Sequence, residues 1–336
     1  MTSAASARPL PARAVPLPDE SLISLVRRTS QAMAYENPRQ LVALLLAQGL
    51  LPPHLNELAP GPVLDHLATL LRLPSAALSF LTVHHHASSL VIVSKKQWTP
   101  RACDSGTTQR YFTASWPVCP QCLQEDSAPY ERLLWSFRPA PICTEHGCLL
   151  VSRCPECNRP FRPDRTDVAQ CTCGATLRDA DPVTVSAHGV GLTKKLLQLL
   201  LGRFSPVSET SPAAWFCWAT RLAAAACKTP GWLADAAKRL GVEPDTSLDS
   251  VAWLAAAEIL AEWPHRQEAF LDAFQQVDKH KTTSTGVGRR FGMLLRSAAR
   301  LEQMGHSAPA DALRRYLLER YDGGHLSGNA GRGPPQ

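Results

Sequence analysis

Eight cysteine and histidine residues, arranged as four closely spaced pairs, constrain the fold of this 336-residue chain more than any other feature. The pairs are Cys119 with Cys122, Cys143 with His146, Cys154 with Cys157, and Cys171 with Cys173. Tetrahedral zinc takes four nitrogen or sulfur ligands, and a C-x2-C turn supplies two of them. The four pairs therefore predict two complete Zn²⁺ sites.

A complete zinc site has no open position for water or substrate, so we expect both ions to be structural rather than catalytic. The rest of the sequence contains no nucleophile–base group, no Gly-rich phosphate loop and no clustered carboxylates of the kind that nucleases use. These observations together predict a protein that is not an enzyme.

The pairs can combine in two ways. Sequential pairing joins the first pair to the second and the third to the fourth, whereas interleaved pairing would give the cross-brace of a RING ubiquitin ligase. In a RING the second and third pairs are nearly adjacent, but here seven residues separate His146 from Cys154. The spacing therefore favours sequential pairing. Cys148 is an alternative ligand in place of His146, because thiolate also binds zinc well.

Cysteine usage indicates a reducing compartment. Of the eleven cysteines, seven belong to the predicted metal pairs, and only Cys103, Cys148, Cys217 and Cys227 remain. We therefore expect a cytosolic protein rather than a secreted, disulfide-bonded one.

No run of 18 apolar residues occurs, so no membrane span is expected. The Ala-, Arg- and Pro-rich start lacks the apolar stretch of a signal peptide.

Hydrophobic spacing and turn residues predict a mainly α-helical protein with a small zinc-ribbon or zinc-finger β region. We expect a disordered lead (1–15), an N-terminal domain with a helix-turn-helix-like bundle (16–115), tandem zinc fingers (116–182), a C-terminal helical domain (183–322) and a disordered tail (323–336).

Individual elements follow from the same patterns. A first helix capped by Asp19 or Ser21 should reach Met33, and residues 90–93 should form a strand. His84–His86 should lie in a surface turn. The other expected helices cover residues 39–48, 62–72, 75–81, 194–201, 213–227, 231–240, 248–263, 267–276, 288–303 and 310–321.

The formal net charge of +6 is concentrated near one end of the chain. Residues 279–320 contain nine basic and three acidic residues, which suits a surface that faces phosphate; solvated helix faces are the alternative. Arg289, Arg296 and Arg300 recur seven and four residues apart and so share a helix face. The candidate DNA-binding residues are Lys95 and Lys96, which lie near Trp98, and Arg289, Arg290, Arg296 and Arg300.

Several motifs together resemble the TniQ family, whose larger relatives include the TnsD target-selection proteins of transposons. The resemblance covers residues 16–180 and depends on the order and spacing of the motifs. They are PLPDESLISLVRR at Pro16–Arg28, Trp116–Cys122, Pro129–Arg132 with Trp135, Pro141–Gly147, Leu149–Leu150, Cys154–Cys157 and Cys171–Gly174.

The resemblance implies a target-selection adaptor in DNA transposition, part of a bacterial mobile element and located in the cytoplasm near the nucleoid. Such an adaptor links target DNA, or a DNA-bound CRISPR effector complex with its guide RNA, to an AAA+ ATPase of the TnsC or TniB type. That ATPase recruits the transposase. The helices of residues 19–48 would then face the ATPase or DNA, and the eight ligands would form two zinc fingers. A homodimer is left open.

The main alternative is a zinc-containing regulator that binds one DNA sequence and needs no ATPase. The two hypotheses differ in the specificity ratio and in the salt dependence of DNA binding. A RING-type ligase and an open-site zinc enzyme are less well supported, because the first requires interleaved pairs and the second an open ligand position.

Overall fold

The computed structural model describes residues 9–35, 40–41, 44–45, 56, 59–86, 111–113, 116–161, 165, 167–242, 248–278 and 291–320. Over these residues the chain is mainly helical and has one two-stranded sheet, which confirms the fold class that the sequence predicts. The Cα positions divide the chain into two compact units, Met1–Val190 and Gly191–Gln336.

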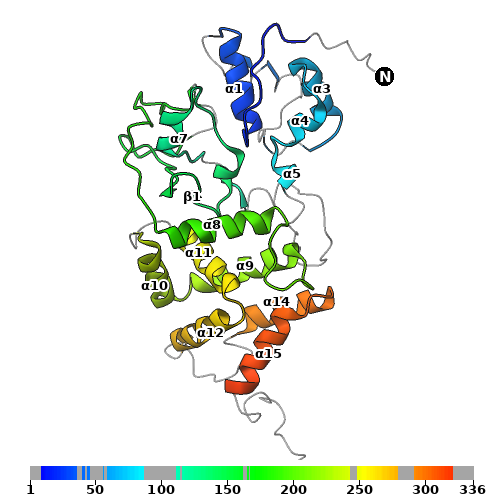
Figure 1. Ribbon diagram of the computed structural model, residues 1–336, viewed down its shortest axis with the longest axis vertical. Helices are drawn as coiled ribbons and strands as arrows, with labels where there is room; N and C mark the ends of the chain where they lie inside the picture. The colour runs from blue at the N-terminus through cyan, green and yellow to red at the C-terminus, as the bar shows by residue number, and fades with distance from the viewer. Residues whose placement is uncertain are drawn as a thin grey trace, which may run out of the picture. The chain divides into compact units, whose positions relative to one another are not determined.

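The first unit contains short helices followed by a small β hairpin (Figure 1). Its helices are α1 (Leu22–Ala32), α3 (Pro62–Leu71), α4 (Ser75–Ser79), α5 (Val83–His86), α7 (Pro120–Glu125) and the 3₁₀ turn η3 (Leu133–Ser136). Strands β1 (Ile142–Cys143) and β2 (Cys148–Leu149) pair antiparallel, with Cys143 opposite Cys148.

Helix α1 begins where the sequence predicts and is buried along most of its length. The hydroxyl of Ser21 accepts a hydrogen bond from the Ser24 N–H at 3.3 Å, so Ser21 is the N-cap. Leu22, Leu25 and Val26 are fully buried in a core that α3 and α4 also line. Burial of each such side chain contributes about 1.5–3 kcal/mol, so packing rather than helix propensity holds α1 in place.

Other expected elements of the first unit have different outcomes. Helices α3 and α4 confirm the predictions for residues 62–72 and 75–81. Most of the predicted helix over 39–48 and the whole predicted strand over 90–93 lie outside the described residues. His84–His86, expected in a surface turn, end the single helical turn α5, where the ring of the exposed His85 lies against that of Phe80, with centroids 4.0 Å apart and planes tilted by 58°.

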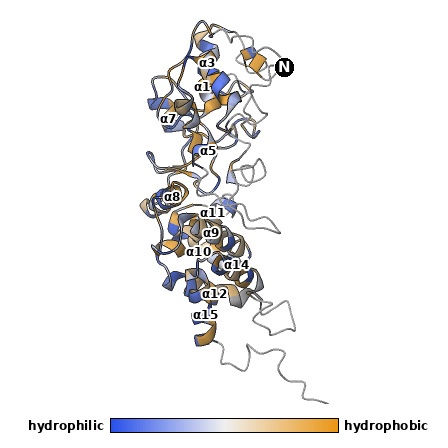
Figure 2. Cartoon of the chain, turned by 90° about the vertical axis from the view of Figure 1, so that its right-hand side faces the viewer, coloured by the Kyte–Doolittle hydropathy of each residue, from blue (hydrophilic) through white to orange (hydrophobic). Residues whose placement is uncertain are grey.

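The second unit is a set of longer helices. Helix α8 (Ala187–Leu200) spans the boundary, and α9 (Pro212–Ala226), α10 (Pro230–Leu240), α11 (Leu248–Ala261), α12 (His265–Asp278), α14 (Gly292–Gln303) and α15 (Ala308–Arg320) follow. Hydrophobic residues recur along these helices (Figure 2). Helix α11 packs along α9, and α14 contacts both α9 and α15. Trp215, Phe216 and Trp218 of α9 are completely buried at the centre.

Two further elements differ from the sequence-based expectation. Helix α8 begins at Ala187 rather than near residue 194, because the Ser186 hydroxyl accepts a hydrogen bond from the Gly189 N–H and caps the helix despite its two glycines. Helix α7 forms within the region expected to hold the zinc fingers and is not among the predicted helices; Pro120 occupies its first position, where the fixed φ of proline suits a helix. No helix among the described residues is long and apolar enough to cross a membrane.

Candidate metal centres

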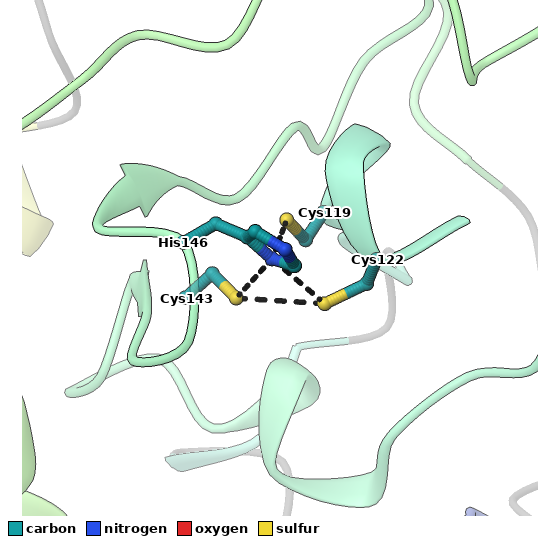
Figure 3. Close-up of side chains that lie close together, drawn as sticks. All are labelled: Cys119, Cys122, Cys143 and His146. Atoms are coloured by element: carbon teal, nitrogen blue, oxygen red, sulfur yellow. Dashed lines mark hydrogen bonds between the residues drawn. The ribbon is translucent and has the colours of Figure 1, made fainter. Parts of the chain in front are cut away.

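The first candidate centre gathers one histidine and three cysteine side chains. Cys119 and Cys122 come from the start of α7, Cys143 from β1, and His146 from the turn between the strands (Figure 3). Their ligand atoms all lie within 4.8 Å of one another, and the three cysteines are buried. Two local turns therefore aim four donors at one point.

The backbone around each C-x2-C or C-x2-H pair has a common geometry. The N–H of the residue after the second ligand donates a hydrogen bond to the carbonyl of the first ligand. These bonds are Leu123 to Cys119 (3.1 Å), Gly147 to Cys143 (2.9 Å) and Asn158 to Cys154 (2.9 Å). Gly147 and Asn158 have positive φ angles, as does Gly174 after the last pair. The left-handed residue reverses the chain and leaves both ligand side chains on one side.

The distances between donors match a tetrahedral zinc site. With Zn–S bonds of about 2.3 Å and Zn–N bonds of about 2.0–2.1 Å, tetrahedral geometry requires about 3.8 Å between sulfurs and about 3.6 Å between sulfur and nitrogen. The Sγ atoms of Cys122 and Cys143 are 3.7 Å apart. The Nδ1 atom of His146 lies 3.2, 3.5 and 3.7 Å from the sulfurs of Cys122, Cys119 and Cys143. The site therefore fits zinc in both size and donor chemistry.

The other ring nitrogen of His146 has its own partner. Nε2 lies 3.0 Å from a carboxylate oxygen of Glu125, at the end of α7. Burial lowers the pKa of His146, but the hydrogen bonds and charges of Glu125 and Cys119 together outweigh it and raise the pKa overall. With Nδ1 facing the sulfurs, the Nε2–H donates to Glu125, which fixes the tautomer that a metal needs. Sequence reasoning missed Glu125.

The second candidate centre is formed by Cys154, Cys157, Cys171 and Cys173. The sulfurs of Cys154 and Cys173 are 3.7 Å apart, as are those of Cys157 and Cys171. Cys173 is exposed at the surface. The first pair thus joins the second and the third joins the fourth. This is the sequential arrangement, not the interleaved one of a RING domain.

The clustered thiols alter one another's acidity. Hydrogen bonds from Cys122, Cys143 and Cys148 to the Cys119 sulfur lower the pKa of Cys119. The same interaction raises the pKa of Cys122, because its proton is held between two sulfurs. In the second centre burial raises the pKa of Cys171, but the Cys173 N–H and the neighbouring thiols lower it to about 6. Each cluster therefore favours one thiolate, that of Cys119 or of Cys171, and thiolate is the form that a metal ion binds.

Cys148 lies beside the first centre. Its buried sulfur is 3.5 Å from the Cys119 sulfur, but the four donors that come together include His146 rather than Cys148. Cys148 is therefore next to the first centre but is not one of its four donors; it begins β2, opposite Cys143.

The Pro129–Arg132 motif supports the first centre from outside. Arg132 donates two hydrogen bonds to Asp126, at 3.0 and 3.1 Å. Its guanidinium also lies over the rings of Tyr130 and Trp135, at 4.4 and 4.9 Å from their centroids. Asp126 follows α7 directly, so Arg132 fixes the helix that carries Cys119 and Cys122.

Only part of the predicted DNA-binding set can be placed. Lys95, Lys96, Arg289 and Arg290 lie outside the described residues. On α14, Arg296 is exposed and Arg300 is half-buried. Of the other arginines in the C-terminal helices, Arg314 pairs with Glu302 at 2.5 Å and Arg320 with Asp272 at 3.3 Å. Among the described residues, no ion pair involves Arg296 or Arg300.

Comparison with known proteins gives one family. No curated protein matches the chain. Residues 11–150 match the TniQ family, a stretch that includes α1 and all four residues of the first centre but ends before Cys154. The resemblance inferred from the sequence is thereby confirmed over this range. Residues 11–150 form a TniQ-family domain.

Proposed function

We propose that the protein is a non-enzymatic target-selection adaptor in DNA transposition, which links target DNA to an AAA+ ATPase that recruits the transposase. The observation that carries the proposal is the TniQ-family domain with a four-donor metal centre inside it. Four protein donors complete a tetrahedral shell, which suits a recognition scaffold and leaves no position for catalysis.

Each centre would hold one structural Zn²⁺. A structural zinc site contributes an apparent binding energy of about 10–16 kcal/mol, which is available only when the ligands are brought together by folding. The segment between residues 116 and 182 has little other regular structure, since its only strands are two residues long within the described residues. Zinc would thus keep these loops rigid enough to present a fixed surface to a partner.

The ATPase contact belongs on the outer face of the N-terminal bundle. Because α1 is buried along most of its length, it offers little surface of its own. Val63 of α3 and Phe80, directly after α4, are instead exposed by 37% and 54%. Helices α3 and α4 contact each other, and two exposed apolar side chains in this part of the bundle would give a protein partner an apolar surface. We therefore place the contact on α3 and α4, with Phe80 at its centre.

The DNA contact belongs on α14. Arg296 and Arg300 share a face and have no ion-pair partner among the described residues, so they are available for phosphate groups. Arginine contacts with phosphate are independent of sequence and weaken steeply with salt. An adaptor can obtain its specificity from a second component, such as a guide-RNA effector complex, or from its own base contacts. Either of these sources of target specificity is compatible with an adaptor of this kind.

The decisive experiment is ATP-dependent co-sedimentation of the zinc-loaded protein with the AAA+ ATPase of the same mobile element, with and without duplex DNA. Co-assembly that needs ATP is the expected result. Phe80→Ser should weaken it, and Leu318→Ser, at a residue 68% exposed in α15, should not. Arg296→Ala should reduce the salt slope of DNA binding by about one.

The opposite result would favour another class. If the ATPase does not co-sediment and the protein alone binds one DNA sequence tightly, the protein is a zinc-containing regulator rather than an adaptor. A large ratio between specific and non-specific DNA affinity would accompany that result.

A further inference from the structure

The start of α1 is hydrogen-bonded to the segment that joins the two ligand pairs of the first centre. The Ser21 N–H donates to the Glu131 carbonyl at 2.8 Å, and the Leu133 N–H donates to the Asp19 carbonyl at 2.8 Å. The hydroxyl of Ser24 accepts from the Glu131 N–H at 3.1 Å. Residues more than 100 positions apart in the sequence therefore form one local structure.

A buried group of three charged residues lies at this junction. Arg27 of α1, Glu131 and Arg165 are 2%, 1% and 2% exposed. One carboxylate oxygen of Glu131 accepts from Arg27 at 3.0 Å, and the other accepts from Arg165. Burial of charges is favourable only when each is paired, so the carboxylate needs both arginines.

Arg165 lies in the loop between Cys157 and Cys171, two of the four cysteines that come together in the second centre. Its guanidinium lies over the ring of Phe161, 5.1 Å from the centroid, and donates weakly to the Trp116 carbonyl at 3.4 Å. The position of Arg165 thus depends on a loop whose two ends the second centre holds together.

A metal ion at the second centre would act on this loop as a cross-link does. Joining the ends of the loop removes conformational freedom that an open loop would regain. Without the ion, the loop opens more readily and Arg165 leaves its position. One oxygen of Glu131 is then buried without a donor, which disfavours the packed arrangement of α1.

We propose that Glu131 couples metal occupancy of the second centre to the seating of helix α1. The inference rests on the proposed assignment of zinc to that centre. The charge group begins on α1, inside the TniQ-family domain of residues 11–150, and is completed by Arg165, which lies outside that range. Loss of the second ion would then loosen the N-terminal bundle as well as the loops around the metal.

Amide hydrogen exchange of α1, measured by mass spectrometry on the full-length protein, tests the coupling. Zinc content is measured on the same samples. Cys171→Ser with Cys173→Ser should leave one bound zinc ion and accelerate exchange in α1 by about tenfold or more. Arg165→Met should retain two zinc ions and accelerate exchange comparably. Arg159→Met, at an exposed residue near the same ligands, is the matched control and should change neither quantity.

A background without the charges gives a second, independent readout. Replacing all three residues by apolar ones (R27L, E131L and R165M) removes the need for pairing and commonly preserves folding. In this background, loss of the second centre should no longer accelerate exchange in α1. The coupling is overturned if Arg165→Met behaves like Arg159→Met, or if the apolar background still responds to loss of the second centre. The metal assignment itself fails only if the cysteine variants leave the zinc content unchanged.

Discussion

At the scale of single residues, the geometry of the first centre depends on a residue outside its four donors. His146 presents Nδ1 to three sulfurs, and the opposite nitrogen lies 3.0 Å from Glu125. An imidazole ring can rotate and change tautomer, so a carboxylate on the far nitrogen selects the form that can act as a ligand. Glu125 is 70% exposed, so its contribution comes from orientation rather than from a strong buried charge.

We predict that Glu125→Ala weakens zinc affinity at the first centre about tenfold, the lower end of the effect typical of residues that orient a metal ligand. Glu125→Gln should have a smaller effect, because its amide oxygen still accepts the histidine N–H. Competition with a chromogenic chelator measures the affinity. Glu145→Ala, at an exposed residue beside His146, is the control, and an equal loss of affinity in both alanine variants would contradict the role of Glu125.

The sequence predicts the ligand set but not this supporting residue. The eight ligands stand out because four successive Cys and His pairs at such short spacing are typical of structural zinc sites. Glu125 has no such signature. It lies three positions after Cys122, and the two share a helix face only because α7 is helical, a helix that the sequence does not predict. The contact between Glu125 and His146 depends on helix α7, so the spacing of residues in the sequence does not reveal it.

At the scale of elements, a buried charge group joins three helices of the second unit. Glu258 of α11 is 3% exposed and accepts two hydrogen bonds from Arg239 of α10, at 2.7 and 2.8 Å. Arg266 of α12 lies 3.1 Å from the same carboxylate. Both guanidiniums also lie over the ring of Trp232. A single carboxylate therefore positions α10 and α12 against α11.

We predict that Glu258→Gln destabilises the second unit by about 2 kcal/mol, because it leaves two arginines facing a neutral amide. Burial raises the pKa of Glu258, but Arg239 and Arg266 outweigh it and hold the pKa below its ordinary value. Because the pKa is lower in the folded state, the stabilisation is present above about pH 4–5 and is lost as the pH falls through the folded value.

Urea unfolding of the wild type and Glu258→Gln at several pH values measures this difference. The gap in unfolding free energy should be full at neutral pH and should close as the carboxylate becomes protonated. Glu262→Gln, one turn later on an exposed position, is the control. A gap that stays constant with pH would show that the loss is one of packing rather than of charge.

Most helices are predictable from the sequence, because apolar spacing and capping residues are local signals. Helices α9 and α10 begin and end within one residue of their expected bounds. The inward direction of Glu258 is not predictable in the same way, because glutamate side chains are mostly exposed in folded proteins. Only the packing of α10 and α12 around it determines that Glu258 is buried.

At the scale of the whole molecule, the two units depend on different forces. Both metal centres belong to the first unit, where long stretches around the ligands have little regular structure. The second unit has a continuous apolar core formed by α9, α11, α12, α14 and α15, with Trp215 and Trp218 completely buried. No metal-ligand cluster occurs in the described part of the second unit. Metal removal should therefore act on one unit and spare the other.

We predict that a strong zinc chelator unfolds much of the first unit and leaves the helices of the second unit intact. The zinc contribution of about 10–16 kcal/mol per site is comparable to the stability of a whole domain, so its loss cannot be absorbed by the small core of α1, α3 and α4. Hydrogen exchange resolved along the chain should show loss of protection over residues 116–185 and retained protection in α9 and α11. Re-addition of zinc should restore the protection. Equal loss in both units would mean that the second unit depends on the metal centres, and no loss in either would mean that the cysteine clusters are not held by metal.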